Sequence, residues 1–494
     1  MITVDFSARG TEGLCEFLYN SLKKQISCGE LRADERLPSK RALSEHLGVS
    51  IITVQNAYAQ LISEGYIYSI EKKGFYVSDV LLLPQGERGK SVTKKTDLNE
   101  PPAWTTAAPT FFTDFRSNSA ALEKFPFSLW AHIMRQVLNS GDEQLLARSP
   151  AGGVLELRRA IAKYLREFRG MNVSAEQIVV GAGTESLYSM VVQLLGRETI
   201  FAVENPGYKK VAGVFRLNGA RCVPVPIDAQ GINPAALERL GATAAHVSPA
   251  HHFPTGMVMP VRRRSELLAW AAGAPNRFII EDDYDSEFRF NGKPLATLQS
   301  VCATDSVIYM NTFSKTLSPS FRIAYMVLPA TLASRFAEQF SFYSCPISSF
   351  EQLTLTRFIN EGHFEKHIIR MKNYYRNLRN TLIHTLEASS LRTRTKIQEE
   401  ESGLHFLLSV QSNYDGNELK KRLEQNGIRI ALLSDFFYDK ADGFATSDAD
   451  LPSDAGMTTH TMVQDAQKTF VVNYSGIRKE RIAETVRRME SVLG

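Results

Sequence analysis

The stretch that decides the fold is VIYMNTFSKTLSPSFR, residues 307–322. It begins with an apolar, strand-like run and continues into a polar segment that contains Lys315 and ends at Arg322. A second apolar run, residues 278–280, ends in the sequence EDDYD at residues 281–285. Ligands collect at strand ends in α/β sheets. Lys315 and the acidic segment are therefore predicted to lie at one edge of a sheet.

The large part of the chain repeats this alternation of strand-like and helical stretches. Strands are expected at residues 177–180, 199–203, 222–225, 244–247, 278–280, 307–310 and 323–327. The alternation predicts an α/β domain with a mainly parallel sheet over residues 112–330. After about residue 330, helices are followed by short strand-like runs and a closing helix, which predicts a smaller α+β subdomain over residues 331–494.

Three strand ends suit one ligand when they are taken together. The sequence GAGT, residues 181–184, leads from a strand into a helix, whose amide groups and dipole make an anion site. Pyridoxal 5′-phosphate needs a lysine that forms an imine, a carboxylate for its pyridine nitrogen and a phosphate-binding turn. The residues that can supply these and the remaining contacts are Lys315, Asp282, Gly183, Thr184, Ser314, Arg322 and, as a stacking ring, Tyr208.

Each of these segments also has a simpler interpretation. A glycine-rich turn can be only a tight turn, and a lysine at a strand end can be a surface lysine. The acidic segment could bind a divalent cation or consist of surface acids. The predicted pyridoxal phosphate site depends on the segments occurring together.

The first eighty residues have the pattern of a winged helix-turn-helix. Helices are expected at residues 11–28, from Ser39 to Gly48, and from Ser50 to Gly65, where serines can cap helix starts and glycines end helices. Two short extended runs at residues 66–70 and 75–77 form a hairpin. This order predicts an α+β winged helix-turn-helix domain over residues 1–80.

The charged and polar side chains of this module are placed as in a DNA-binding surface. Lysines and arginines at the start of the second helix and at the hairpin tip can meet phosphates, and short polar side chains on the third helix can reach base edges in a major groove. These residues are Lys40, Arg41, Lys72 and Lys73 for phosphates, and Ser50, Thr53, Gln55 and Asn56 for bases. The alternative is a protein-docking module with a solvated polar face. Net charge, +4 for the chain, does not decide between them.

Composition places the chain among multi-domain globular proteins. Hydrophobic residues make up 44% and charged residues 22%, which excludes disordered and fibrous classes. Residues 84–110 contain prolines among lysines, threonines and small polar residues, so residues 81–111 are predicted to form a linker. The five scattered cysteines argue against a disulfide framework and a zinc site. With no signal-peptide pattern and no apolar run of about 18 residues, we expect a cytoplasmic protein without a membrane segment.

The large part resembles the fold type I aminotransferases, and the whole chain is similar to the MocR subfamily of GntR-type regulators. The motifs that carry the resemblance are LPSKRAL (37–43), LGVS (47–50), AY (57–58), EGY (64–66), ENPGY (204–208), FPTG (253–256), EDDYDSEF (281–288) and TFSKTLSPSFR (312–322). The resemblance implies that Lys315 forms the imine, Asp282 partners the pyridinium nitrogen and Tyr284 approaches the ring hydroxyl. It also implies that Tyr208 stacks on the cofactor, that Ser314 and Arg322 bind its phosphate, and that the protein is a homodimer.

Three positions depart from the pattern of these relatives. The late strand that carries a carboxylate-binding arginine in aminotransferases reads FVVNY here, residues 470–474. A bidentate guanidinium contact is hard to replace, so amino-acid turnover is not expected. Phe253 stands where an asparagine usually precedes Pro-Thr-Gly, and His251 or His252 could substitute for it. Ile51 stands where an arginine commonly follows the capping serine.

The sequence therefore predicts a regulator that binds double-stranded operator DNA and senses pyridoxal phosphate, or its adduct with an amino acid. The absent arginine favours control of vitamin B6 synthesis or salvage. The alternatives are a regulator of amino-acid metabolism, such as that of γ-aminobutyrate, an aminotransferase with an appended DNA-binding domain, and a scaffold with a vestigial cofactor site.

Overall fold

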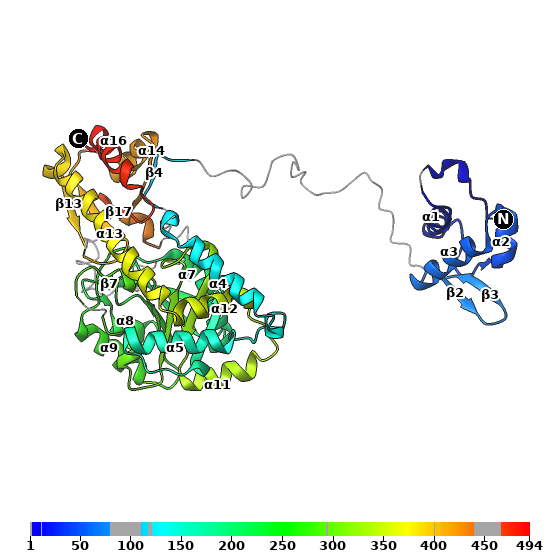
Figure 1. The fold of residues 1–494 in the computed structure, drawn as a ribbon, viewed down its shortest axis with the longest axis horizontal. Coiled ribbons are helices and arrows are strands. Elements are labelled where there is room, and N and C mark those ends of the chain that lie inside the picture. The colour runs from blue at the N-terminus through cyan, green and yellow to red at the C-terminus, as the bar shows by residue number, and fades with distance from the viewer. Residues whose placement is uncertain are drawn as a thin grey trace. The chain divides into compact units, whose positions relative to one another are not determined.

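The computed structural model describes residues 2–10, 12–79, 110–116, 121–292, 295–399, 401–438 and 466–494. The chain divides into two compact units, Met1–Ala108 and Pro109–Gly494, each of which is described by itself (Figure 1). Nearly all of the predicted linker, residues 81–111, lies outside the described residues. Within the described residues, no helix combines the length and apolar character needed to cross a bilayer.

The first unit contains three helices and a small antiparallel sheet. The helices are α1 (Leu14–Ser27), α2 (Lys40–Leu47) and α3 (Ile51–Ser63). The strands β1 (Arg36–Leu37), β2 (Ile67–Ile70) and β3 (Gly74–Val77) pair in the order β1-β3-β2, so the predicted hairpin gains a third strand. Buried side chains of all three helices, including Leu18, Leu43 and Tyr58, form one core.

Local chemistry explains where the helices of this unit begin and end. The Ser39 hydroxyl accepts a hydrogen bond from the Ala42 amide at 3.1 Å, and Gly48 ends α2 with a φ of 65°. The Ser50 hydroxyl accepts from the Thr53 amide at 3.0 Å and so caps α3. These two caps fix the turn between α2 and α3.

The second unit is built on an eight-stranded sheet in the order β5-β12-β11-β10-β9-β6-β7-β8. The strands are β5 (Ile178–Ala182), β6 (Ile200–Asn205), β7 (Arg221–Asp228), β8 (Gly231–Ile232), β9 (Ala244–Val247), β10 (Phe278–Asp282), β11 (Val307–Thr312) and β12 (Ile323–Val327). The central run from β11 to β7 is parallel, which confirms the mainly parallel sheet. β12 is antiparallel to both of its neighbours, so the sheet is mixed.

Alternate side chains of these strands enter different cores. Val179 and Met310 pack with helices α6 (Thr184–Leu195), α7 (Lys209–Leu217) and α11 (Ala330–Gln339). Val180 and Tyr309 pack on the opposite face with α4 (Phe127–Asn139), α5 (Leu155–Arg169) and α12 (Ser349–Asn360). On this opposite face, toward β7, the helices are α8 (Pro234–Arg239), α9 (Val261–Ala272) and α10 (Leu298–Val301). This period-two division is typical of a sheet covered on both faces.

A smaller antiparallel sheet forms the other part of this unit, with the order β13-β14-β17-β16. Its strands are β13 (Thr395–Gln398), β14 (His405–Val410), β16 (Ala431–Leu432) and β17 (Thr469–Asn473), and β15 (Ile428–Arg429) pairs in parallel with β4 (Thr113–Asp114). Its core includes residues of α13 (His363–Glu387), α14 (Gly416–Gln425) and α16 (Ile482–Leu493), and Figure 1 shows α13 as a single long helix.

The packing moves the predicted boundary at residue 330. Phe336 of α11 and Phe358 of α12 are buried against the large sheet, and the core of the small part begins within α13, at Met371. Phe115, which the prediction assigned to the large domain, packs in the core of the small part. Helical periodicity in the sequence identifies the apolar face of α11 and of α12. It does not indicate which of the two sheets that face packs against.

Candidate functional site

A cavity of about 470 Å³ opens where several strands of the large sheet end. Seven of the eight residues predicted to bind the cofactor line this cavity: Thr184, Tyr208, Asp282, Tyr284, Ser314, Lys315 and Arg322. The eighth, Gly183, comes immediately before Thr184, and a Cβ atom built on it would lie 2.3 Å from Nη2 of Arg322. The fold thus brings the predicted residues to one place from strand ends that are far apart in sequence.

Lys315 lies just after β11, lines the cavity and is partly buried. Burial lowers the pKa of its amine to about 8, while the carboxylates of Asp285 and Asp282 act in the opposite direction. A lysine with a lowered pKa has more of the unprotonated amine at neutral pH, and this is the form that attacks a carbonyl carbon. Lys315 is therefore suited to imine formation.

Asp282 ends β10 with its two carboxylate oxygens in different surroundings. Oδ2 accepts a hydrogen bond from the Tyr188 hydroxyl at 2.7 Å and lies 3.5 Å from Nε2 of His246. Oδ1 is buried and has no hydrogen-bond partner among the described residues. A buried carboxylate oxygen without a donor is costly, and a protonated ring nitrogen in the cavity would supply that donor.

The other end of the cavity gathers groups that suit an anion. Thr184 begins α6 after Gly183, whose φ of 84° and ψ of 168° are accessible to glycine. Arg322 and Lys210 both pair with the carboxylate of Glu185. Burial opposes ionisation of Glu185, but the hydrogen bond from Lys210 and the further donors lower its pKa to about 2. The helix start and the two cations are suited to an anion, and we call them the predicted anion-binding end of the cavity.

Ser314 and the two predicted tyrosines complete this part of the site. The Ser314 hydroxyl accepts a hydrogen bond from the Thr312 hydroxyl at 3.0 Å. Tyr208, at the start of α7, leaves 47% of its surface exposed and meets the ring of Phe253 edge-on, with centroids 5.8 Å apart. The Tyr284 hydroxyl lies 3.2 Å from Nδ1 of His251.

The two histidines proposed as replacements for the missing asparagine have different surroundings. Nδ1 of His251 lies 2.9 Å from Oδ2 of Asp285, which places His251 between that carboxylate and the Tyr284 hydroxyl. His252 lines the cavity, and burial lowers its pKa to about 3. A neutral His252 is thus the histidine that can contact a ligand in the cavity, whereas His251 can act on it through Tyr284.

The carboxylates of residues 281–285 do not converge on one cation. Glu281 accepts hydrogen bonds from the amides of Leu298 and Gln299 at 2.7 and 3.0 Å. Asp283 pairs with Arg169 on the other side of the sheet from the Asp282 contacts, and Asp285 pairs with His251. Among the described residues these acids have separate protein partners, which favours the cofactor interpretation over a divalent-cation site.

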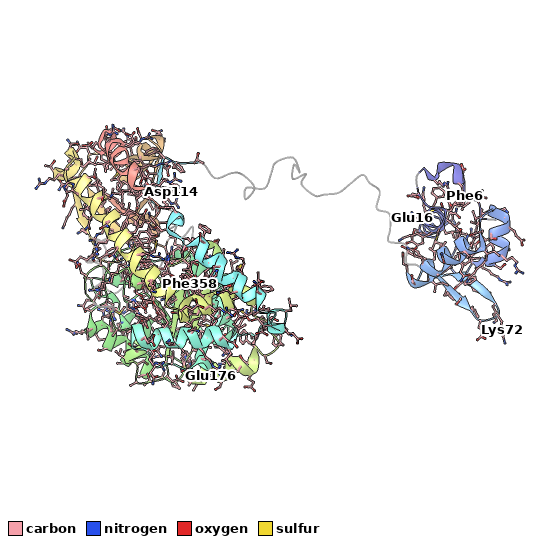
Figure 2. The ribbon with its side chains drawn as sticks, viewed as in Figure 1. Phe6, Glu16, Lys72, Asp114, Glu176 and Phe358 are labelled. Carbon is pink, nitrogen blue, oxygen red and sulfur yellow. The ribbon has the colours of Figure 1, made fainter. Side chains whose placement is uncertain are left out.

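The predicted DNA-contact residues lie on two parts of the first unit. Lys40 and Arg41 begin α2, and the Lys40 ammonium lies 5.3 Å from the centroid of the Phe75 ring. Lys72 and Lys73 lie in the turn between β2 and β3, and Figure 2 shows Lys72 projecting from the hairpin tip.

The exposed side of α3 carries the remaining predicted residues. Gln55 and Asn56 are exposed, whereas the hydroxyls of Ser50 and Thr53 lie 2.8 Å apart in the helix cap. These two hydroxyls are thus partly used in starting the helix. Ile52, which was not predicted as a contact, leaves 69% of its surface exposed in the first turn.

Sequence reasoning missed several residues of the cavity. Tyr188 lies one helical turn after Thr184 on α6, and this i, i+4 spacing is a signal that it shares the face of Thr184. His246 lies on β9, the parallel neighbour of β10, opposite Ile280 in register. Arg116, Glu185 and Lys210 also line the cavity. Nothing in the sequence around these three residues separates them from ordinary charged residues of the surface.

Comparisons with known proteins identify both units. The family described as "Aminotransferase class I and II" matches residues 114–436, and the family "Bacterial regulatory proteins, gntR family" matches residues 14–77. The chain is 35% identical over 426 residues to the uncharacterized HTH-type transcriptional regulator YdeL of Bacillus subtilis, covering 85% of this chain and 89% of that protein. It is 30% identical over 421 residues to the HTH-type pyridoxine biosynthesis transcriptional regulator PdxR of Corynebacterium glutamicum, covering 85% and 88%.

A third relative and a solved structure extend this picture. The probable rhizopine catabolism regulatory protein MocR of Rhizobium meliloti is 31% identical over 430 residues, covering 85% of this chain and 86% of that protein. The multiple substrate aminotransferase of Thermococcus profundus shares the fold with a TM-score of 0.63 and 22% identity, over 77% of this chain and 90% of that one. The chain thus belongs to the MocR subfamily of GntR-type helix-turn-helix transcription regulators, in which the DNA-binding unit is joined to a fold type I aminotransferase domain.

Proposed function

We propose that this regulator binds pyridoxal 5′-phosphate covalently through Lys315 and that occupation of the cavity changes its affinity for operator DNA. The single observation that carries the proposal is the pairing, in one cavity, of a lysine with a lowered pKa and a buried carboxylate with an open oxygen, Asp282 Oδ1. When bound, the cofactor supplies an aldehyde that condenses with amines. Lys315 would bind the carbonyl carbon of the cofactor, and Asp282 would accept a hydrogen bond from its ring nitrogen. The anion-binding end, which includes Thr184 and Arg322, would bind its phosphate.

The surroundings of the cavity support a sensor in preference to an enzyme. Asn473 lines the cavity on β17, where the resemblance to aminotransferases places a carboxylate-binding arginine. A neutral amide at this strand position cannot orient a substrate carboxylate as the guanidinium of an aminotransferase does, so we infer that the substrate geometry of an aminotransferase is not reproduced and that amino-acid turnover is not productive. The name of the relative PdxR supports control of vitamin B6 synthesis or salvage, with pyridoxal phosphate itself as the effector.

The DNA-binding part of the proposal rests on the first unit. Lys40, Arg41, Lys72 and Lys73 would meet phosphates, and Gln55 and Asn56 on α3 would read base edges, with Ser50 and Thr53 at the start of that helix. We propose that the protein acts in the cytoplasm as a homodimer that presents two such modules to paired half-sites, because a two-fold protein matches a two-fold operator.

One experiment tests covalent binding and its consequence together. Purified protein is titrated with pyridoxal phosphate, and its absorbance is followed before and after borohydride reduction. DNA affinity is then measured by fluorescence anisotropy, with and without the cofactor, on fragments selected from a random duplex pool. Lys315→Ala is compared with Lys163→Ala, which removes an exposed lysine of α5.

We expect an imine band in the wild type and in Lys163→Ala but not in Lys315→Ala, and a cofactor-dependent change in DNA affinity in the first two alone. A protein that stays colourless, or whose DNA affinity is unchanged by the cofactor, would contradict the proposal. Steady conversion of an amino acid and a keto acid, abolished in Lys315→Ala, would show an aminotransferase instead.

A further inference from the structure

The cavity has a second cationic wall, contributed by the small part of this unit. Arg116, which follows β4, lines the cavity together with Asn473 of β17 and Ala431 of β16. These residues come from a different part of the fold from Lys210, which lies in α7, and Arg322, which comes just before β12. The cavity therefore offers positive charge on two separately built walls.

Backbone hydrogen bonds fix the place of Arg116. The Asn473 amide donates to the carbonyl of Phe115 at 3.2 Å, and the Phe115 amide donates to the carbonyl of Arg429 at 2.7 Å. The Arg116 amide itself donates to Oδ1 of Asp114 at 2.9 Å. Arg116 thus directly follows Phe115, which is hydrogen-bonded to Asn473. Asn473 occupies the position on β17 at which the resemblance to aminotransferases places an arginine.

The charges around the cavity leave Arg116 available for a ligand. Lys210 and Arg322 share Glu185, and the carboxylate of Asp114 pairs with Arg429 at 3.5 Å. Within the part of the chain that the structure describes, the Arg116 guanidinium forms no ion pair, and its side chain is exposed toward solvent and the cavity. A guanidinium in this state can form a charge-assisted, bidentate contact with a carboxylate.

Asn473 adds a second polar group to the same wall. Its Oδ1 accepts hydrogen bonds from the amide and the hydroxyl of Ser475, at 3.3 and 2.9 Å. The N–H groups of the Asn473 side chain then remain as hydrogen-bond donors toward the cavity. Arg116 and Asn473 together present donors only, and such a set selects an anion.

We propose that Arg116 is the cation of a carboxylate subsite in this cavity, so that the ligand class of the regulator includes amines that also carry a carboxylate. The inference rests on the proposed function, because the ligand amine must lie where the cofactor carbonyl and Lys315 meet. It places the carboxylate contact on the segment after β4, in place of the late strand β17.

Stable conjugates test the subsite without any reaction in the cavity. N-(5′-phosphopyridoxyl)-L-alanine and N-(5′-phosphopyridoxyl)ethylamine differ only in that a hydrogen replaces the carboxylate. A second pair, made from 4-aminobutyrate and propylamine, places the carboxylate farther from the nitrogen. Binding is measured by calorimetry to the cofactor-free full chain, for the wild type, Arg116→Ala, Arg116→Lys and the control Arg135→Ala, which removes an exposed arginine of α4.

In the wild type and Arg135→Ala, we expect the carboxylate conjugate of at least one pair to bind more tightly than its partner by a factor of roughly ten or more. A charge-assisted contact provides a free energy of this size. In Arg116→Ala this ratio falls to within about twofold, because only the carboxylate conjugate loses affinity. Arg116→Lys keeps the charge without the bidentate geometry and gives an intermediate ratio.

Three results would overturn the inference. They are equal binding within both wild-type pairs, a ratio that persists in Arg116→Ala, and a loss in Arg116→Ala that is equal for both members of a pair. If the wild type binds none of the conjugates, the proposed function itself fails, whereas a failure of the inference alone leaves strong binding of all four. Thermal melts of each variant identify a substitution that affects folding, and in that case Arg116→Lys decides.

Discussion

Two glycines at opposite ends of one helix provide a matched test of the anion-binding end. Gly183 precedes α6 with φ and ψ of 84° and 168°, and Gly196 follows it with 94° and 152°. Both lie in a backbone region that is essentially restricted to glycine. A Cβ atom on Gly183 would meet Nη2 of Arg322 at 2.3 Å, whereas a Cβ atom on Gly196 would have nothing within 4 Å. The two alanine variants therefore share the backbone strain but only one displaces Arg322.

The sizes of the two effects follow from this geometry. Backbone strain lowers the free energy of unfolding by about 1–3 kcal/mol in either variant. In Gly183→Ala the Arg322 guanidinium must also move, which removes a charge-assisted contact to a ligand phosphate of about 1.5–3 kcal/mol. Because 1.4 kcal/mol corresponds to a factor of ten, we expect Gly183→Ala to bind pyridoxal phosphate roughly tenfold to a hundredfold more weakly than Gly196→Ala.

The assay compares pyridoxal phosphate with pyridoxal, which lacks the phosphate. Equilibrium titrations are followed by the absorbance of the imine, and urea unfolding of the cofactor-free variants reports the shared strain. The difference between the two variants should be present with pyridoxal phosphate and nearly absent with pyridoxal. Equal affinities of the two variants for pyridoxal phosphate, or the same difference with both vitamers, would refute the assignment of Arg322 to the phosphate.

Three further predictions concern Lys315, the proposed imine lysine, and the DNA-binding unit. With the pKa of Lys315 lowered to about 8, the unprotonated amine increases as pH rises through that value. The rate of condensation with pyridoxal phosphate should therefore level off above about pH 9, and a rate that still climbs toward pH 10.5 would contradict the lowered pKa. Replacing Lys72 and Lys73 together by alanine should weaken binding to all DNA sequences and reduce the slope of log K against log salt by about 1–2; an unchanged slope would mean that the hairpin does not contact DNA. Gln55→Ala or Asn56→Ala should relax sequence preference in selection from a random duplex pool, and a uniform loss of affinity would count against base reading.

The sequence was most informative where local chemistry decides the structure. The capping serines, Ser39 and Ser50, and the helix-ending Gly48 follow from side-chain and backbone preferences that act within a few residues. The strands β9 and β12 have the bounds expected from their apolar runs, because fully buried strands consist almost wholly of apolar residues. Most of the predicted residues that line the cavity, such as Lys315 and Asp282, followed from their positions after strand ends, whereas Tyr188 and His246 were missed.

The features that were not predicted depend on contacts between distant segments. β4 is a two-residue strand without a detectable periodicity, and it is defined by its pairing with β15, more than 300 residues later in the chain. The position of Arg116 at the cavity depends on that pairing, so no local pattern indicates it. The antiparallel direction of β12 does have a local signal, because the connection of residues 313–322 is shorter than the dozen or so residues that a parallel crossover requires.

Glu185 gives the anion-binding end a built-in competitor. Its carboxylate pairs with both Lys210 and Arg322, so a phosphate that bound these cations would have to displace an internal negative charge. The free energy of capture is then the difference between two anions on the same pair of cations. Under the proposed function, an exchange of this kind shifts half-saturation toward higher pyridoxal phosphate concentrations, which suits a reversible sensor better than a permanently bound cofactor.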